Sequence, residues 1–242
     1  MKLVVDTHTH TVSSGHAYST VQEMARGAAD NGIEMFAVTD HGPSMKGAPY
    51  LYHFGNLKVI PEILYGVRII KGVEANIIDY DGNTDMPQGY LKRLDFAIAS
   101  FHDICIAPST QEEHTRALVN VLANPMIDAV AHPGNPQFQV DIDTVVKAAK
   151  KYGKFIEINN HSFAVRTGSE ANCREFIRKC KEYCVKIICG SDAHISFDVG
   201  RFDNVNSLLD ELNMPEDLVM NTSVNNFAAY FESRKARIAD ML

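Results

Sequence analysis

Short apolar runs alternate with amphipathic helix signals along the whole chain, at intervals of about 30 residues, which is the spacing of βα units. Several runs are continuous rather than strictly alternating, as expected for parallel strands that are covered on both faces. Seven strands are expected, at residues 2–6, 34–40, 67–77, 94–100, 126–132, 154–160 and 186–193, with a short eighth as an option at 218–223. The pattern predicts an α/β barrel close to the eight-stranded TIM kind. Residues 1–242 are expected to form one domain, because no linker divides them.

Capping signals indicate where the helices between these strands begin. Thr20 and Glu23 have the spacing of a capping box, and Thr110 and Glu113 repeat it. Asp143 is expected to open a third helix. These signals place helices directly after three of the predicted strands, as a barrel of βα units requires.

The composition is that of an ordinary globular protein, with 45% hydrophobic residues and a mean hydropathy of −0.14. The longest apolar runs are strand-sized, so no segment is expected to span a bilayer. No signal peptide is expected, because the N-terminus enters a strand at once. The five cysteines are odd in number, and Cys173, Cys180 and Cys184 share an apolar helical stripe. Buried free thiols in a cytoplasmic protein are the preferred interpretation.

The formal net charge of −7 argues against a long nucleic acid as partner. The densest basic stretch contains Arg234, Lys235 and Arg237 and is interpreted as the solvated face of a helix.

Histidines and carboxylates gather at or just beyond the ends of the predicted strands. In barrels of this type the active site lies at the carboxyl ends of the strands. His8 and His10 leave the first strand two residues apart, so both imidazoles point to the same side and can bind one ion. The candidate metal ligands are His8, His10, His16, His41, Glu74, His102, His132, Asp192 and His194.

Glu74 lies in an apolar run, and a buried carboxylate is costly unless it is paired or binds a metal. Nine ligands exceed what one or two zinc ions require, so three divalent ions are expected, with one carboxylate bridging. Zinc is preferred, and manganese or iron would suit the same ligands. Three such ions would make the pocket strongly positive although the protein is acidic, which favours a phosphate substrate.

Several motifs resemble those of the PHP (polymerase and histidinol phosphatase) superfamily, in order and over nearly the whole chain. They are His8-Thr9-His10, Thr39-Asp40-His41-Gly42, the Glu74 strand, Phe101-His102, Ala131-His132-Pro133-Gly134 and Gly190-Ser191-Asp192-Ala193-His194. The segments His16-Ala17-Tyr18-Ser19-Thr20, Glu74-Ala75-Asn76-Ile77 and Glu157-Ile158-Asn159-Asn160 look closer still to its YcdX-type phosphatase branch. The resemblance implies a distorted (β/α)7 barrel with a trinuclear metal centre and association into a homo-oligomer.

Carried over residue by residue, the resemblance divides the ligands into three groups that share Glu74. His8, His10, Glu74 and Asp192 would hold one ion, Glu74, His102 and His132 the second, and His16, His41 and His194 the third.

The charge of such a centre suggests how it would act on a phosphate ester. A hydroxide bridging two ions would attack phosphorus, while the third ion steadies a phosphate oxygen. Asp192 or His194 could pass a proton to the leaving group. Asp6 and Asp40 are expected either to orient ligand imidazoles or to act as turn residues.

The sequence therefore predicts a metal-dependent phosphatase acting on a small phosphorylated metabolite. The alternatives are a histidinol-phosphate phosphatase, a nucleotide-directed phosphoesterase or exonuclease, or a non-catalytic metal-binding module. Arg166 and Arg201 are candidates for holding the substrate phosphate, with surface roles as the alternative. Three other histidines are interpreted less specifically: His53 as part of a lid, His114 as solvated on a helix, and His161 as a solvent-facing loop residue.

Overall fold

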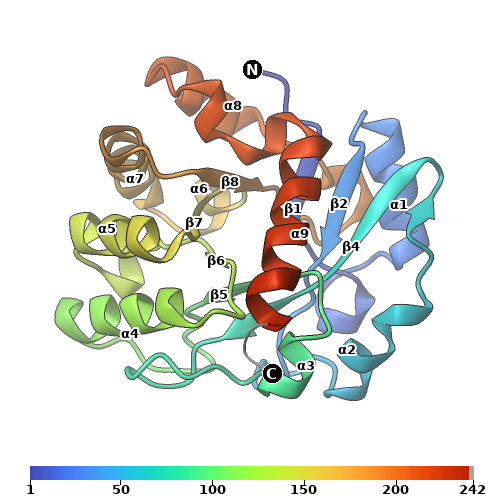
Figure 1. Cartoon of the computed structure of the whole chain (residues 1–242), viewed down its shortest axis with the longest axis horizontal. Coiled ribbons are helices and arrows are strands. Elements are labelled where there is room, and N and C mark those ends of the chain that lie inside the picture. Colours follow the sequence, from blue (N-terminus) through green and yellow to red (C-terminus); the bar gives the residue numbers. More distant parts are fainter. Residues whose placement is uncertain (240–242) are drawn as a thin grey trace.

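The computed structural model describes residues 1–239, which form a nearly closed barrel of parallel strands surrounded by helices (Figure 1). The strands neighbour one another in the order β1-β2-β4-β5-β6-β7-β8, and each adjacent pair is parallel. Their bounds are β1 Val5–Thr9, β2 Met35–Val38, β4 Val67–Asn76, β5 Phe96–Ser100, β6 Ala129–Val130, β7 Phe155–Asn159 and β8 Ile187–Gly190. Six of them lie within the predicted ranges, and β1 overlaps its range of 2–6 but extends to Thr9, so the seven-stranded barrel is confirmed.

Helices cover the outside of the barrel, and Figure 1 shows α4, α5 and α7 side by side along one flank. The helices of the described residues are α1 Val21–Asp30, α2 Tyr52–Asn56, α3 Gln88–Leu91, α4 Gln111–Ala123, α5 Ile142–Tyr152, α6 Ser162–Val165, α7 Ser169–Tyr183, α8 Asp203–Glu211 and α9 Val224–Ala239. Short 3-10 turns are η1 Val12–Ser14, η2 Leu57–Val59, η3 Pro136–Phe138, η4 Ser196–Asp198, η5 Glu216–Leu218 and η6 Met220–Thr222. None of the described helices is long and apolar enough to cross a membrane.

The helix caps predicted from the sequence are present, except that the cap of one helix lies two residues earlier than expected. Thr20 and Glu23 form a complete capping box on α1, and the Thr110 side chain caps α4. The cap of α5 is Asp141, not Asp143, because the Asp141 carboxylate accepts the Thr144 N–H and the helix begins two residues earlier than expected.

One short strand was not predicted from the sequence. β3 (Ile63–Leu64) pairs antiparallel with the beginning of β4. The connecting residues Tyr65 and Gly66 both have positive φ angles, 52° and 81°, which suits a tight hairpin turn. The sequence signal was the Tyr65-Gly66 pair between the apolar Ile63-Leu64 and Val67.

The optional eighth strand is not a strand but a pair of 3-10 turns that fills the gap between β8 and β1. Val219 makes a single parallel bridge with Ile187 of β8. The buried Asn221 amide links β1 and β8. Its Nδ2 donates to the Val5 and Cys189 carbonyls and its Oδ1 accepts the Cys189 N–H, each at 2.8 Å. One side chain therefore satisfies backbone groups that a further strand would otherwise pair.

Helix α9 closes the amino-terminal end of the barrel, opposite the predicted ligands. Phe227 and Phe231 pack into a buried cluster made from the first halves of the strands, including Val5, Met35 and Phe96. With this end plugged by apolar side chains, only the carboxyl ends of the strands remain open to substrate.

The interpretation of the basic stretch on α9 as solvated was wrong for Arg234. Its side chain is 3% exposed, and its Nε donates to both Asp128 carboxylate oxygens at 3.0 and 2.8 Å. Arg237 and the Tyr230 hydroxyl bind the same carboxylate, at 3.0 and 2.6 Å. Lys235 is 69% exposed, as expected. The charges of α9 thus anchor the helix to the loop before β6.

The cysteine prediction holds for part of the stripe. Cys173 and Cys180 are buried and free, whereas Cys184 is exposed, because it is the left-handed C-cap at which α7 ends and the stripe is interrupted.

Candidate metal centre

The structure brings the nine predicted ligands together at the carboxyl ends of the strands. Six of the nine form three overlapping groups, within each of which the donor atoms lie no more than 4.8 Å apart, while His132, His16 and Asp192 adjoin them at 2.8 Å from Glu74, 3.0 Å from His194 and 3.2 Å from His10. The groups are His8, His10 and Glu74; His41, Glu74 and His102; and His10, His41 and His194. Adjacent parallel strands end at the same rim, so residues more than 180 positions apart in the chain become neighbours.

The fully buried Glu74 carboxylate is the centre of this cluster. Ser100 Oγ donates to Oε1 at 2.8 Å and is the only hydrogen-bond partner of the carboxylate other than histidine among residues 1–239. Five imidazole nitrogens surround the two oxygens: His132 Nε2 at 2.8 Å and His102 Nε2 at 3.4 Å from Oε1, and His41 Nδ1 at 2.7 Å, His8 Nε2 at 3.3 Å and His10 Nε2 at 3.4 Å from Oε2. The two oxygens therefore face different sets of imidazoles, as a bridging carboxylate would.

Donor atoms of the candidate ligands converge on one another, and two of them have no hydrogen-bond partner. His41 Nδ1 and Glu74 Oε2 are buried and have no hydrogen-bond partner, although they lie 2.7 Å apart. The Nε2 atoms of His8 and His10 face each other at 3.0 Å, as do those of His16 and His194. Buried polar atoms are rarely left unpaired, and lone pairs that converge in this way suit a cation between them. The residues present thus fit divalent metal ions.

Two of the candidate ligands have a left-handed backbone. His132 has a φ of 33° and Asp192 a φ of 56°, a region that non-glycine residues seldom occupy. Each lies two residues beyond the end of a strand, β6 for His132 and β8 for Asp192. Strained backbone of this kind gathers at functional sites.

Polar side chains behind the imidazoles bind their other ring nitrogens and hold the rings in place, and the sequence did not identify most of these partners. Glu157 Oε1 binds His8 Nδ1 at 2.7 Å, while its other oxygen accepts the His132 N–H. Asn76 Oδ1 binds His102 Nδ1 at 2.7 Å. Such contacts set which ring nitrogen is free for a metal. The available signal was the polar residues at alternate positions in the apolar runs of β4 and β7.

Asp40 supports the ligands indirectly. It accepts hydrogen bonds from Thr11, His53 and Ser14, and the Ser14 hydroxyl lies 3.1 Å from His10 Nδ1. Asp6 does not contact an imidazole; it accepts the backbone N–H groups of His8, Ser191 and Gly200. Of the two roles expected for these residues, Asp6 has the turn role, and Asp40 orients His10 through a serine.

Gly190, the last residue of β8, permits the close packing beneath the site. A Cβ at this position would overlap the Glu157 carboxylate and His8 Cβ. Only glycine allows β8 to approach the His8–Glu157 pair this closely.

The carboxylates control the protonation of the cluster. Burial alone would lower the pKa of His8, but Glu157, Glu74 and Asp192 outweigh burial and hold that pKa well above its usual value. Burial would likewise raise the pKa values of Glu74 and Asp192, but the neighbouring imidazoles, led by His8, hold both well below the usual range. Without metal, His8 therefore carries a proton between ionised carboxylates.

The remaining shifted imidazoles are neutral near pH 7. Burial, together with the adjacent His41, holds the pKa of His10 well below its usual value. Burial and Arg166 lower the pKa of His132 to about 4. The pKa values of His16 and His194 are also lowered, mainly by burial. These rings present free lone pairs without first having to lose a proton.

Metal binding is expected to release about one proton per protein molecule near pH 7, from His8, because a ligating imidazole must be deprotonated. Since the folded apoprotein holds this proton up to the raised pKa of His8, apparent metal affinity should increase with pH through neutrality and fall on acidification. Calorimetric titration of the apoprotein with Zn²⁺ in two buffers of different ionisation enthalpy measures the release. Equal heats in both buffers would contradict it.

Arg166 and Arg201 occupy different environments. Arg166 is 16% exposed, lies 3.5 Å from Asp192 Oδ2, and lines the cavity over the ligands. Arg201 is 60% exposed and pairs with Asp198, away from the residues that line this cavity. The structure thus brings only Arg166 to the site.

The three remaining histidines also differ from one another. His161 is half-buried and lines the cavity, with its ring 6.1 Å from that of His194. His114 is 1% exposed, so its interpretation as solvated was wrong. It accepts the Ser109 N–H at Nε2 and binds the Gln139 carbonyl through Nδ1, which joins the loops after β5 and β6. These partners lie in loops that the periodicity of α4 does not describe.

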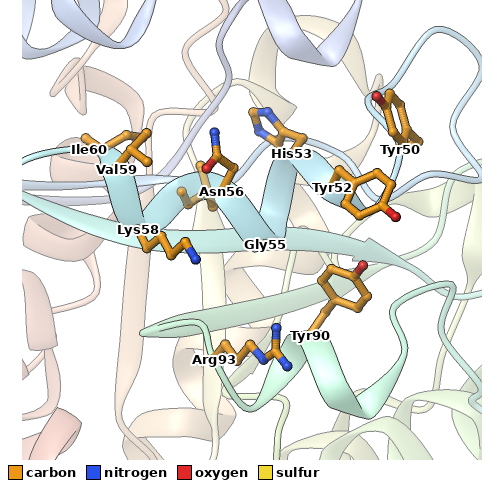
Figure 2. A pocket seen from close by; sticks show the side chains of 11 residues that line it. Tyr50, Tyr52, His53, Gly55, Asn56, Lys58, Val59, Ile60, Tyr90 and Arg93 are labelled. Atoms are coloured by element: carbon orange, nitrogen blue, oxygen red, sulfur yellow. The ribbon is translucent and has the colours of Figure 1, made fainter.

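A cavity of about 540 Å³ opens over the candidate ligands. A second pocket lies beside α2 and η2, where Figure 2 shows the rings of Tyr50, Tyr52 and Tyr90 together with Lys58 and Arg93. Tyr52 is 74% exposed and lines this second pocket, not the cavity over the ligands. His53 lines the same pocket, and its Nε2 lies 3.1 Å from Asp40 Oδ2. This segment therefore contacts a residue that orients the ligands and does not cover the cavity above them.

Known proteins resemble this chain in sequence and in fold. The family model of the PHP domain matches residues 6–161. A "probable phosphatase" of Acetivibrio thermocellus is 71% identical over 238 residues, covering 98% of this chain and 99% of that protein. A "probable phosphatase" of Thermoanaerobacter pseudethanolicus is 54% identical over 240 residues, covering 98% of each.

Two solved structures share the fold. The histidinol phosphate phosphatase of Lactococcus lactis, complexed with zinc, L-histidinol and phosphate, superposes with a TM-score of 0.61 at 15% identity and covers 89% of this chain and 95% of its own. A chain of an archaeal ribonuclease P with mature tRNA gives 0.65 at 12% identity, with 95% and 91% coverage. At these identities the likeness concerns the fold alone.

Proposed function

We propose, from the premise that the chain belongs to the PHP domain family, that it is a metal-dependent phosphatase which hydrolyses a small phosphomonoester. The observation that carries this proposal is the buried Glu74 carboxylate among five imidazoles, whose Oε2 and the facing His41 Nδ1 both lack a hydrogen-bond partner. The high similarity to relatives named probable phosphatases over their full length supports the same reaction class.

Three divalent ions are proposed. Imidazole and carboxylate ligands suit zinc, manganese and iron alike. Zinc is preferred because the Lactococcus lactis enzyme was solved with zinc. Bound ions would supply the positive charge that attracts phosphoryl oxygens and lowers the pKa of water. The groups that would hold them are His8, His10, Glu74 and Asp192; Glu74, His102 and His132; and His16, His41 and His194.

Arg166 is proposed to bind the substrate phosphate. Its Nη1 donates to Ser162 Oγ at 3.0 Å, which fixes the side chain, and lies 3.5 Å from the nearest carboxylate oxygen, Asp192 Oδ2. A guanidinium held in this way can form two parallel hydrogen bonds to a phosphate.

Asp192 is proposed to handle the proton of the leaving group in preference to His194. The two Asp192 oxygens are distinct: Oδ1 faces His10 Nε2 at 3.2 Å, and Oδ2 faces Asn159 and Arg166. Oδ2 is therefore the oxygen not needed as a ligand. Because the pKa of Asp192 is held well below its usual range, the carboxylate would pass a proton on to the leaving group and not retain it near neutral pH. His194 has no such spare atom, because Nδ1 binds the Asp192 carbonyl and Nε2 is its metal-facing donor.

Assay of the protein loaded with Zn²⁺ or Mn²⁺ tests this function. A panel of phosphomonoesters that includes histidinol phosphate, with bis(4-nitrophenyl) phosphate as the diester, distinguishes the alternatives. We expect monoester hydrolysis that a chelator abolishes. Faster cleavage of the diester would favour a phosphodiesterase, and no turnover by fully metal-loaded protein would favour a non-catalytic module; either result would overturn the proposal.

A further inference from the structure

We infer that the alcohol portion of the substrate is an uncharged, apolar group, such as a benzyl-type or aliphatic alcohol, that packs against Ile104 and Val165 at the mouth of the metal cavity. This inference rests on the proposed function and specifies the class of substrate within it.

The lining of the 540 Å³ cavity divides by chemistry. Six of its residues are candidate metal ligands: His16, His41, Glu74, His102, Asp192 and His194. The other six come from the connections that follow β2, β5 and β7 and are Met45, Asp103, Ile104, His161, Val165 and Arg166. The phosphate would occupy the first part, so the second part meets the leaving group.

Apolar side chains from each of these three connections form much of this second part. Met45 lies between β2 and α2, Ile104 follows β5, and Val165 ends α6 after β7. Ile104 is 55% exposed and Val165 is 56% exposed. Single exposed aliphatic residues are common, but here they converge on one cavity beside a highly charged cluster. A ligand that removes their surface from water gains hydrophobic free energy.

The polar residues of the second part do not offer an alternative. Arg166 is the only lysine or arginine among the lining residues, and it is already assigned to the phosphate. A second anionic group on the substrate would therefore lack a cation. The Asp103 carboxylate is exposed and accepts a hydrogen bond from Gln137 at 3.1 Å. Its attraction for an ammonium group on the substrate would therefore be weak, because water and salt screen exposed charges.

A polyol substrate would also be poorly matched. Each buried hydroxyl needs a hydrogen-bond partner, and one that lacks it lowers affinity. Beyond Arg166 and Asp103, the only polar side chain of the second part is His161. An apolar group needs no such partners, so it is the best match to the second part of the cavity lining.

Three phosphomonoesters with primary alkoxide leaving groups test the inference: benzyl phosphate, glycerol 3-phosphate and phosphoethanolamine. For the metal-loaded wild-type protein we expect kcat/KM for benzyl phosphate to exceed the other two by about tenfold or more, the range that a few apolar contacts provide. Ile104→Ser and Val165→Ser should each reduce this preference several-fold, about threefold to tenfold, with little effect on glycerol 3-phosphate.

The chain supplies matched controls. Ile63 is 62% exposed and Val59 is 66% exposed, and neither lines the metal cavity. Ile63→Ser and Val59→Ser should leave the preference unchanged. Calorimetric Kd values for benzylphosphonate against 2-hydroxyethylphosphonate provide a second readout that does not depend on turnover, and the same two cavity variants should weaken only the former.

The outcomes separate this inference from the proposed function. Absence of hydrolysis for all three esters by metal-loaded protein would overturn the function and the inference together. Hydrolysis without preference, a preference for glycerol 3-phosphate or phosphoethanolamine, or loss of the benzyl preference in the control variants would overturn the inference alone.

Discussion

Glu74→Ala is expected to lower kcat/KM on a phosphomonoester by at least about a thousandfold and to leave the protein deficient in metal. Loss of a residue that only hydrogen-bonds to a metal ligand typically costs about 10–100-fold in metal affinity or activity. Glu74 is proposed to contact the ions directly, so its loss should cost more. Its two oxygens lie among five imidazole nitrogens, so its removal takes away the shared anion of the whole cluster. Elemental analysis and steady-state kinetics on the same preparations measure both effects.

Glu74→Gln separates loss of function from loss of folding. The amide keeps the shape of the side chain and can still accept the Ser100 hydroxyl, but it has no charge and only one acceptor oxygen. We expect this variant to fold, by circular dichroism and thermal unfolding, and to remain depleted of metal. Glu62→Ala, on an exposed residue away from the cavity, is the control and should retain full activity. Full metal content and turnover in Glu74→Gln would contradict the assigned role.

Arg234→Ala is expected to lower the free energy of unfolding by about 3–5 kcal/mol, the cost of removing one partner from a buried ion pair. The variant leaves the fully buried Asp128 with less compensation, because Arg237 is only partly buried. It also frees the Leu94 and Met126 carbonyls, to which Arg234 donates at 2.6 and 3.1 Å. Urea denaturation followed by circular dichroism gives the difference directly.

Lys235→Ala is the matched control for this variant. Lys235 adjoins Arg234 on α9, but it is 69% exposed and pairs only with the exposed Glu232. Its substitution should change the free energy of unfolding by less than about 1 kcal/mol, as for most surface ion pairs. If Arg234→Ala cost no more than Lys235→Ala, the anchoring of α9 by Asp128 would be disproved.

The candidate ligands could be predicted because their signal is local. Most of them follow an apolar run that is recognisable by itself, Glu74 lies within one, and parallel strands necessarily end at one rim. His8, Glu74 and Asp192 therefore converge although the sequence contains no direct information about their contacts. The capping box of Thr20 and Glu23 was predictable for the same reason, since both partners lie within one helical turn.

The residues that were misjudged owe their environment to distant partners. Arg234 appeared solvated beside two other basic residues, but it is buried by a carboxylate 106 positions away. His114 appeared to be on a solvated helix face, but Gln139 and Ser109 enclose it from two loops. Helical periodicity places a side chain on a face and does not reveal what covers that face.

By itself, the sequence determined the repeating βα units, most helix starts and the set of donor residues at the strand ends, because short-range periodicity and strand direction encode all three. Only the tertiary structure decided which atoms meet. It placed Glu157 behind His8, used Asn221 to fill the gap where an eighth strand would stand, and separated Arg166 from Arg201. These contacts depend on side-chain packing between segments far apart in the chain, and such packing has no periodicity that can be read from the sequence.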